Sequence, residues 1–454
     1  MSDDPANRSL DRALSVRAGA LWVEECSVTE LAQRFGTPLH VMSERQVRGN
    51  ARAIRDAFAR HWSAGPVLIL PSIKANYALA LRRILTEEGT GCDTFGPSEL
   101  HAALAGRVPP ALISVNGSAK DAALIEAAVK AGARVTLDSA AELELVSDAA
   151  RRLRTRAKIR LRIRPDYDGM EMPSDLVPGR SVRHAAQGYK PGIAPEAALE
   201  VGATALKRPE LELTGLMAHL GRHSARIDVW SGMANSFALL AGRLAKAWNW
   251  QPQELDIGGG YPVPRDPTSP ARENAPPLEQ IAAAICVALR DGLARSDLDP
   301  AGIRLELEPG RSLFADAGIH LARVRHVKTQ TLPEPRRWIE TDTTEMFMPD
   351  LLVERAMFRP IFNGRAGKES PADIVGISCG FDVLAEQVMA PEVAAGDIIA
   401  FLDTGAYQDS ASANFNALPR PGTVLVNGAH AEWIKRPETI AEVFARDVIP
   451  ERFA

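Results

Sequence analysis

A lysine directly follows an apolar run in the first quarter of the chain: Lys74 stands four residues after Val67–Leu70, in "PSIKANYA". An ammonium group where a buried strand ends is either a solvated surface charge or an amine that is kept there because it reacts. Removal from water favours the neutral amine, which forms Schiff bases with aldehydes. Lys74 is therefore the first candidate for covalent chemistry.

Two glycine-containing stretches are suited to binding a phosphate group. Gly258, Gly259 and Gly260 follow one apolar run in "LDIGGGYPV", and Gly310 and Arg311 follow another in "LELEPGRSLF". Glycines let backbone N–H groups approach an anion closely, and an arginine neutralises its charge. Taken alone, the triplet is often only a turn, and the arginine can lie on the surface.

An acid and an imidazole complete the set. Glu308 precedes Pro309, and His219 ends the run "GLMAH". A carboxylate beside a pyridine nitrogen keeps that nitrogen protonated, and an imidazole offers a flat face for stacking. His219 alone is more often a buried structural histidine. Together with the amine and the phosphate-binding glycines, these groups predict a site for pyridoxal 5'-phosphate.

Repeated strand–helix units are needed to bring these residues together. Amphipathic helices, among them 119–130 and 229–248, alternate with short buried strands, and eight such units predict an α/β fold with a closed (β/α)8 TIM barrel. Catalytic groups of such barrels lie at the carboxyl ends of the strands. The expected strands are 66–70, 90–94, 112–115, 134–137, 158–163, 212–218, 254–257 and 304–307.

The pattern changes after the last barrel strand. Short strands separated by Gly- and Pro-rich turns predict a C-terminal antiparallel β-domain over 316–454. An N-terminal strand at Leu21–Glu24, in segment 1–38, is expected to join that domain, and the barrel is expected over 39–315. Ser27 is expected to begin a helix with a capping box.

Composition limits the classes of partner. The chain has 454 residues, 46% of them hydrophobic, and a net charge of −4, which gives no reason to expect nucleic acid or membrane as a partner. The start of the chain lacks a signal-peptide pattern, so a cytoplasmic location is expected. The four cysteines, Cys26, Cys92, Cys286 and Cys379, have neither disulfide-framework nor zinc-site spacing. No metal site is expected.

Several motifs, in order, resemble those of the fold-type III pyridoxal phosphate decarboxylases. They include "PSIKANYA", "GTGCDTFGPSEL", "VNGSAKD", "LRIRP", "LMAHLG", "LDIGGGYPV", "LELEPGRSLFADAG" and "FLDTGAYQDS". The resemblance covers roughly residues 20 to 435 and is strongest to the diaminopimelate decarboxylase branch, whose relatives act on ornithine, arginine and lysine. It implies a homodimer with active sites at the subunit interface.

The resemblance also implies residue roles. Lys74 is then the Schiff-base lysine, Glu308 the partner of the pyridine nitrogen and His219 the stacking imidazole. Asp93 and Arg162 match positions that line and order the pocket behind the cofactor. The glycines of both stretches and Arg311 match phosphate-binding positions.

The β-domain is expected to contribute further groups. Tyr407 matches a tyrosine that reaches the phosphate. Cys379 resembles the cysteine that the partner subunit inserts as a proton donor, with Lys74 as the alternative donor. Asp382 is then expected near the distal amine of the substrate.

The chain departs from the family pattern at four places, one of which is Gly380, where a glutamate often follows the cysteine in diaminopimelate enzymes. Arg222 stands where a phosphate-binding serine is usual and is itself a candidate phosphate contact, and Asp382 is three residues from Cys379 rather than four. The Arg-Pro-x-x-Tyr stretch that binds substrate carboxylate in diaminopimelate enzymes is replaced by "MPDLL", which begins at Met348. Met348 is expected near the distal end of the substrate. Loss of a bidentate clamp disfavours an unmodified diaminopimelate site.

The sequence thus predicts a pyridoxal phosphate-dependent decarboxylase of a diaminopimelate-like or basic amino acid. One alternative substrate is D-lysine, D-ornithine or a carboxylated siderophore or polyamine intermediate. A racemase and a catalytically silent, partner-binding relative are further alternatives. Glu308 favours decarboxylation, because a barrel racemase of this cofactor class places an arginine beside the ring nitrogen.

Overall fold

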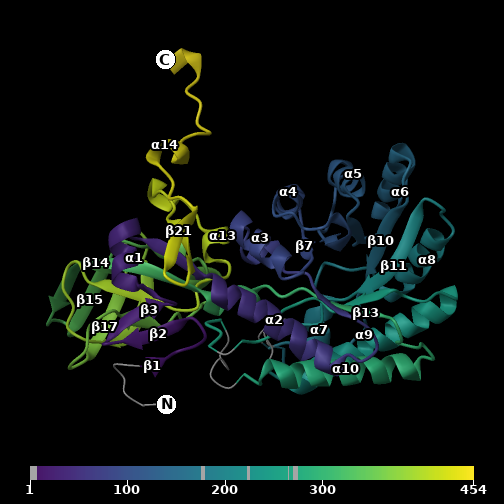
Figure 1. The fold of residues 1–454 in the computed structure, drawn as a ribbon, viewed down its shortest axis with the longest axis horizontal. Helices are drawn as coiled ribbons and strands as arrows, with labels where there is room; N and C mark the ends of the chain where they lie inside the picture. The colour runs from purple at the N-terminus through teal and green to yellow at the C-terminus, as the bar shows by residue number, and fades with distance from the viewer. Residues whose placement is uncertain (1–7, 175–178, 222–224, 264, 269–274, 454) are drawn as a thin grey trace. The chain divides into compact units, whose positions relative to one another are not determined.

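The computed structural model describes residues 8–174, 179–221, 225–263, 265–268 and 275–453 (Figure 1). The chain divides into two compact units. The first, here called the β-domain, comprises Met1–Gly49, Arg265–Pro270 and Phe314–Ala454, and the second, the barrel, comprises Asn50–Pro264 and Ala271–Leu313.

Eight parallel strands form the barrel, as predicted. They pair in the order β6-β13-β12-β11-β10-β9-β8-β7. Backbone hydrogen bonds from Gly91 N to Ile69 O (2.9 Å) and from Asp93 N to Pro71 O (3.2 Å) join the two outer strands. The strands are β6 (Val67–Ile69), β7 (Cys92–Thr94), β8 (Ile113–Val115), β9 (Arg134–Leu137), β10 (Ala157–Arg162), β11 (Leu211–Met217), β12 (Glu254–Asp256) and β13 (Arg304–Leu307).

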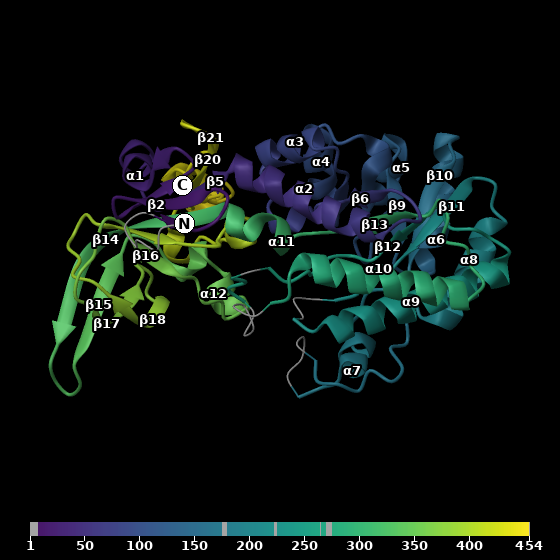
Figure 2. The same ribbon diagram turned by 60° about the horizontal axis from the view of Figure 1, so that its bottom comes forward.

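Helices follow the strands and surround them, because each helix buries one apolar face. The local signals agree with the packing: Asp121 caps the helix that follows β8 by accepting from Leu124 N at 2.8 Å, and left-handed Gly132 ends it. Figure 2 shows α9 and α10 side by side. The helices are α2 (Glu44–His61), α3 (Leu79–Glu87), α4 (Pro97–Ala105), α5 (Ala122–Ala131), α6 (Ala141–Leu153), α7 (Val182–Gln187), α8 (Pro195–Leu206), α9 (Ile227–Trp248) and α10 (Leu278–Arg295).

The β-domain contains a nine-stranded sheet and a smaller four-stranded sheet. The large sheet is mainly antiparallel, but β5 with β20 and β15 with β17 are parallel pairs. Its strands are β5 (Leu39–Ser43), β14 (Gly318–Gln330), β15 (Arg336–Thr341), β16 (Pro360–Phe362), β17 (Ser370–Val375), β18 (Val383–Ala390), β19 (Ile398–Phe401), β20 (Gly422–Asn427) and β21 (His430–Lys435). The small sheet contains β1 (Arg8–Ser9), β2 (Leu14–Arg17), β3 (Ala20–Val23) and β4 (Cys26–Ser27).

The N-terminal part of the β-domain differs in detail from the expectation. The strand expected at Leu21–Glu24 is β3, which pairs within the small sheet, although Leu21 packs in one apolar cluster with Leu321. The strand that joins the large sheet is β5, which the sequence placed in the barrel. Its five residues are all buried, and a short buried run has the same pattern in either setting.

The helix expected after Ser27 is present as α1 (Val28–Phe35), but its capping box is not. The Ser27 side chain makes no capping hydrogen bond. The helix instead buries Val28, Leu31 and Ala32, so packing rather than capping fixes its start.

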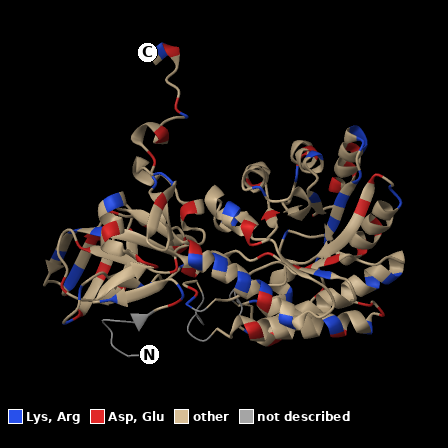
Figure 3. Ribbon diagram, viewed as in Figure 1, with Lys and Arg blue, Asp and Glu red and all other residues tan. Residues whose placement is uncertain are grey.

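Charged residues of both signs are interspersed along the ribbon (Figure 3). This agrees with the near balance of 53 lysines and arginines against 57 aspartates and glutamates. Within the described ranges, no helix is long and apolar enough to cross a membrane.

Candidate active site

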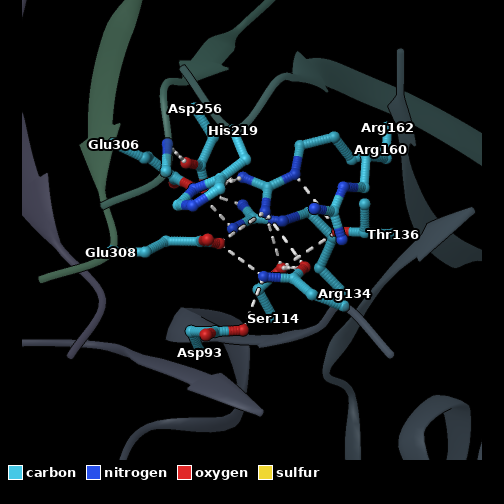
Figure 4. Close-up of polar contacts among 12 residues, drawn as sticks. Asp93, Ser114, Arg134, Thr136, Arg160, Arg162, His219, Asp256, Glu306 and Glu308 are labelled. Carbon is cyan, nitrogen blue, oxygen red and sulfur yellow. Dashed lines mark hydrogen bonds and ion pairs between the residues drawn. The ribbon is translucent and has the colours of Figure 1, made fainter. Parts of the chain in front are cut away.

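The barrel brings the predicted cofactor residues to the carboxyl ends of its strands. Lys74 lies in a 3₁₀ turn, Ile73–Ala75, after β6, and Asp93 lies in β7. His219 follows β11 and Glu308 follows β13. Figure 4 shows Asp93, His219 and Glu308 around the same end of the barrel interior.

The turn that carries Lys74 is fixed from two sides. Ser72 N donates to Pro309 O at 3.1 Å, and Ser72 Oγ donates to Asp93 Oδ2 at 2.7 Å. The Lys74 side chain itself is exposed. The turn thus places the side chain beyond the buried strand, so the strand end alone does not desolvate this amine as the sequence suggested.

Glu308 is a buried acid held by its backbone and its side chain. Its N–H donates to Gly258 O at 2.7 Å, and its carboxylate accepts from the Asn116 side-chain amide. Burial, with Asp256 and Asp93 nearby, raises the pKa of Glu308 well above its usual range, whereas Arg160 acts in the opposite direction. A carboxyl group with a raised pKa is suited to share a proton with a neighbouring group.

Arg160, which the sequence analysis missed, lies at the centre of this network. Its guanidinium is 2.7 Å from both Asp256 Oδ2 and Glu306 Oε2, and 3.6 Å from Glu308 Oε1. The pKa of Arg160 is raised by these carboxylates against the effect of burial. The sequence did contain a clue to Arg160. It lies two residues before Arg162, and residues two apart in a strand face the same side of the sheet.

Arg162, the arginine that was predicted, faces a different set of groups. Its nearest acid is Asp138, at 3.9 Å, and its guanidinium lies 6.0 Å from the centre of the Tyr189 ring. It lines a cavity of about 290 Å³ together with His219 and Met233. The further lining residues are Ile163, Arg164, Pro165, Tyr167, Ala185, Ala186, Tyr189, Pro191 and Gly221.

The glycine turn after β12 is built for close approach. Gly258 has φ +71°, and a Cβ on Gly259 would lie 2.0 Å from the Glu308 carbonyl oxygen. His219 Nδ1 accepts from Gly259 N at 3.3 Å, so imidazole and turn are fixed together. Tyr261 donates its hydroxyl to Gly258 O at 2.9 Å.

The other predicted phosphate-binding residues are Gly260, Gly310, Arg311 and Arg222. Gly260 has φ +88°, and Arg311, which follows Gly310, is buried at the start of α11 (Arg311–Phe314). Arg222 lies outside the described residues. A glycine turn without room for side chains, a buried arginine and a buried acid fit a flat, anionic cofactor with a ring nitrogen.

The β-domain residues divide into exposed and buried ones. Cys379 is exposed, and its Sγ accepts from Asn416 Nδ2 at 3.3 Å. Tyr407 is partly buried and has φ +67° at the start of α13 (Gln408–Ala411). These two side chains retain their candidate roles.

Two substrate-binding expectations are corrected. Asp382 is 1% exposed, and its carboxylate accepts from Glu345 N, Thr344 Oγ1 and Ser378 N at 2.7, 3.0 and 2.6 Å. It therefore shapes the Cys379 loop rather than facing a substrate amine. Met348 is fully buried in the apolar core of the β-domain.

Within the described residues, no group of three or more His, Cys, Asp or Glu side chains is arranged to hold a metal ion. The acids at the end of the barrel are paired with arginines and amides instead.

The family profile described as "Pyridoxal-dependent decarboxylase, pyridoxal binding domain" matches residues 44–315. The chain belongs to this family. The decarboxylase is 31% identical over 440 residues to the diaminopimelate decarboxylase of Actinosynnema pretiosum subsp. auranticum, covering 95% of this chain and 93% of that protein. It is 28% identical over 449 residues to the diaminopimelate decarboxylase of Methanocaldococcus jannaschii, covering 96% and 97%.

Solved structures agree with this assignment. The crystal structure of the M. jannaschii diaminopimelate decarboxylase superposes with a TM-score of 0.89 at 26% identity, covering 97% of this chain and 99% of that one. The same enzyme in complex with L-lysine gives a TM-score of 0.87 at 26% identity, with both chains fully covered. The protein is thus a fold-type III decarboxylase that uses pyridoxal 5'-phosphate.

Proposed function

We propose that this decarboxylase removes CO₂ from a diaminopimelate-like or basic amino acid, with its cofactor held covalently by Lys74. The observation that carries the proposal is the arrangement of Glu308, the glycine turn and the Lys74 turn at one end of the barrel, where they are joined by backbone hydrogen bonds. The likeness to diaminopimelate decarboxylases, one of them in complex with L-lysine, supports a substrate with a distal amine.

The bound cofactor would supply an electron sink for the pair left on the alpha carbon. Lys74 would bind its aldehyde, and the N–H groups of the glycine turn with Arg311 would bind its phosphate. Glu308 would hold a proton at the ring nitrogen. His219, fixed by Gly259 N, would support the ring face.

The β-domain would act on the substrate side. We propose a cytoplasmic homodimer in which Cys379 of one copy returns the proton to the alpha carbon in the site of the other. Its exposure supports this role, and the Asn416 contact supports its orientation. Tyr407 would contribute to phosphate binding.

One observation favours a second candidate substrate. The Met348–Leu352 segment offers no arginine, Met348 is buried, and Arg355 and Arg359 are exposed. Without the carboxylate clamp of diaminopimelate enzymes, D-lysine, D-ornithine or a carboxylated siderophore or polyamine intermediate is the alternative substrate.

The test is CO₂ release from a panel that contains diaminopimelate and the L- and D-forms of lysine, ornithine and arginine. We expect release with one or a few of these, abolished in Lys74→Ala and retained in Lys130→Ala, a control at an exposed lysine. Racemisation without CO₂ would contradict a decarboxylase. Cofactor binding without turnover of any amine-bearing substrate would contradict the substrate class.

A further inference from the structure

The side-chain amide of Asn116 joins two acids of the candidate site. Its Nδ2 donates to Asp93 Oδ1 at 2.7 Å and also to Glu308 Oε1. Its Oδ1 accepts from Ser114 Oγ at 2.7 Å and from Arg160 Nη2 at 3.2 Å. All five side chains are at least nine-tenths buried, so water does not replace these bonds.

This pattern permits only one orientation of the amide. Arg160 only donates hydrogen bonds, so the amide oxygen of Asn116 faces the guanidinium and its NH₂ group faces the two acids. Rotating the amide by half a turn would place its oxygen against both carboxylates and its NH₂ group against the arginine. The donors at one end therefore fix the direction in which Asn116 offers its own N–H groups to Glu308.

Arg160 balances the charges that surround Glu308. Asp256 and Asp93 are the neighbouring acids, and Arg160, 3.6 Å from Glu308 Oε1, is the neighbouring cation. Burial and the two acids raise the pKa of Glu308, and Arg160 opposes them. Figure 4 shows Arg160, Asp93 and Glu308 directed toward the same point.

We propose that Asn116, oriented by Ser114 and Arg160, is a positioning residue that holds the Glu308 carboxyl group in place and, by donating to it, favours its charged form against burial and the two neighbouring acids, so that the proton resides on the ring nitrogen of the cofactor. This inference rests on the role proposed above for Glu308. A neutral amide suits the task because it satisfies two acids without adding a third charge.

The test compares Asn116→Ala with wild type after reconstitution with pyridoxal phosphate that is isotope-labelled at the ring nitrogen for NMR. We expect a pyridinium signal in wild type and a shift toward neutral pyridine in the variant. The dissociation constant for pyridoxal phosphate, measured on the apoprotein by fluorescence, is expected to rise about tenfold, as for loss of a bond to a charged group.

Thr136→Val is the matched control. Thr136 is buried in the same network, where its hydroxyl accepts from Arg160 Nε at 3.2 Å and lies 3.1 Å from Ser114 Oγ, and among the described residues it makes no hydrogen bond to Glu308 or Asp93. It should leave the ring-nitrogen signal in place. A shift as large as that of Asn116→Ala would assign the effect to general loosening and overturn the proposal.

Two further variants keep the test decisive. Ser114→Ala removes one anchor of Asn116 without touching either carboxylate, and it should shift the signal in the same direction by less, even if Asn116→Ala fails to fold. In a Glu308→Gln background, loss of Asn116 should have no added effect on the signal. If neither Asn116→Ala nor Ser114→Ala changes the pyridinium signal, the inference about Asn116 is overturned and the proposed function is not. If cofactor binding does not depend on Lys74, the proposed site itself is overturned.

Discussion

Arginines and carboxylates form buried ion pairs inside the barrel, whereas two clusters of the β-domain consist of hydrophobic side chains. Arg134 and Arg160 are both within 2.7 Å of Glu306, and neither arginine side chain is more than 3% exposed. In the β-domain, Leu321, Val424 and Phe401 belong to apolar clusters. The barrel interior thus contains paired charges that these two clusters of the β-domain lack.

This difference between the two units suggests separate contributions to the stability of the fold and to the chemistry of the site. A buried ion pair often gains little net stability, but removal of one partner leaves a costly charge. Apolar burial stabilises without fixing any charge. We infer that the β-domain contributes packing and that the barrel interior sets the charge of Glu308.

The largest effect is expected from Arg160→Met, which leaves Asp256 and Glu306 without this cation. We expect the free energy of unfolding to fall by about 3–5 kcal/mol, the scale of a broken buried pair. Urea unfolding measures it. Arg304→Met is the control, since its side chain is 31% exposed and water can replace part of its interaction, so its loss should be smaller. Equal losses would contradict a special role for Arg160.

Leu321→Ala tests the apolar side of the comparison. Leu321 is fully buried, and a truncation in such a core is expected to cost about 3 kcal/mol. Leu332→Ala, at a position that is 80% exposed, should change stability little. The absorbance of bound cofactor should be unchanged in folded Leu321→Ala. Loss of the cofactor absorbance in this variant would show that packing of the β-domain and cofactor binding in the barrel are not separable.

The buried histidine pair of the β-domain predicts a pH dependence. His320 Nδ1 lies 3.2 Å from His40 Nδ1, and burial lowers the pKa of His40 to about 4. The unfolded chain takes up a proton on His40 near its usual pKa of about 6.5, whereas the folded chain does so only near pH 4. The full stability of the fold is therefore present above about pH 6.5 and is progressively lost as the pH falls toward 4.

The expected slope is about 1.4 kcal/mol per pH unit for each proton taken up on unfolding. His40→Leu should reduce the slope of unfolding free energy between these pH values, whereas the exposed His430→Leu should not. Parallel slopes for wild type and His40→Leu would show that the pair does not titrate in this way.

The smallest effect is expected from Tyr261→Phe. It removes the hydroxyl that donates to Gly258 O, a bond of about 1 kcal/mol. The dissociation constant for pyridoxal phosphate should rise by roughly fivefold. An unchanged constant in Tyr261→Phe would show that the glycine turn keeps its form unaided.

The sequence predicted the barrel because each of its strands is a short buried run between turn residues and amphipathic helices. The same reasoning misplaced β5, whose buried run "LHVMS" does not distinguish the two sheets. Motif spacing located Lys74, His219 and Glu308 but not Asn116 or Arg160, because their value depends on which side chains meet across the barrel. Asp382 was misjudged because sequence does not reveal that its oxygens are already occupied.

The attachment point of the cofactor is the most direct test of the whole account. Borohydride reduction of the holoenzyme, followed by proteolysis and mass spectrometry, should find the reduced cofactor on the peptide that contains Lys74 and on no other lysine. An adduct on another residue, such as the buried Lys120, would contradict the assigned site.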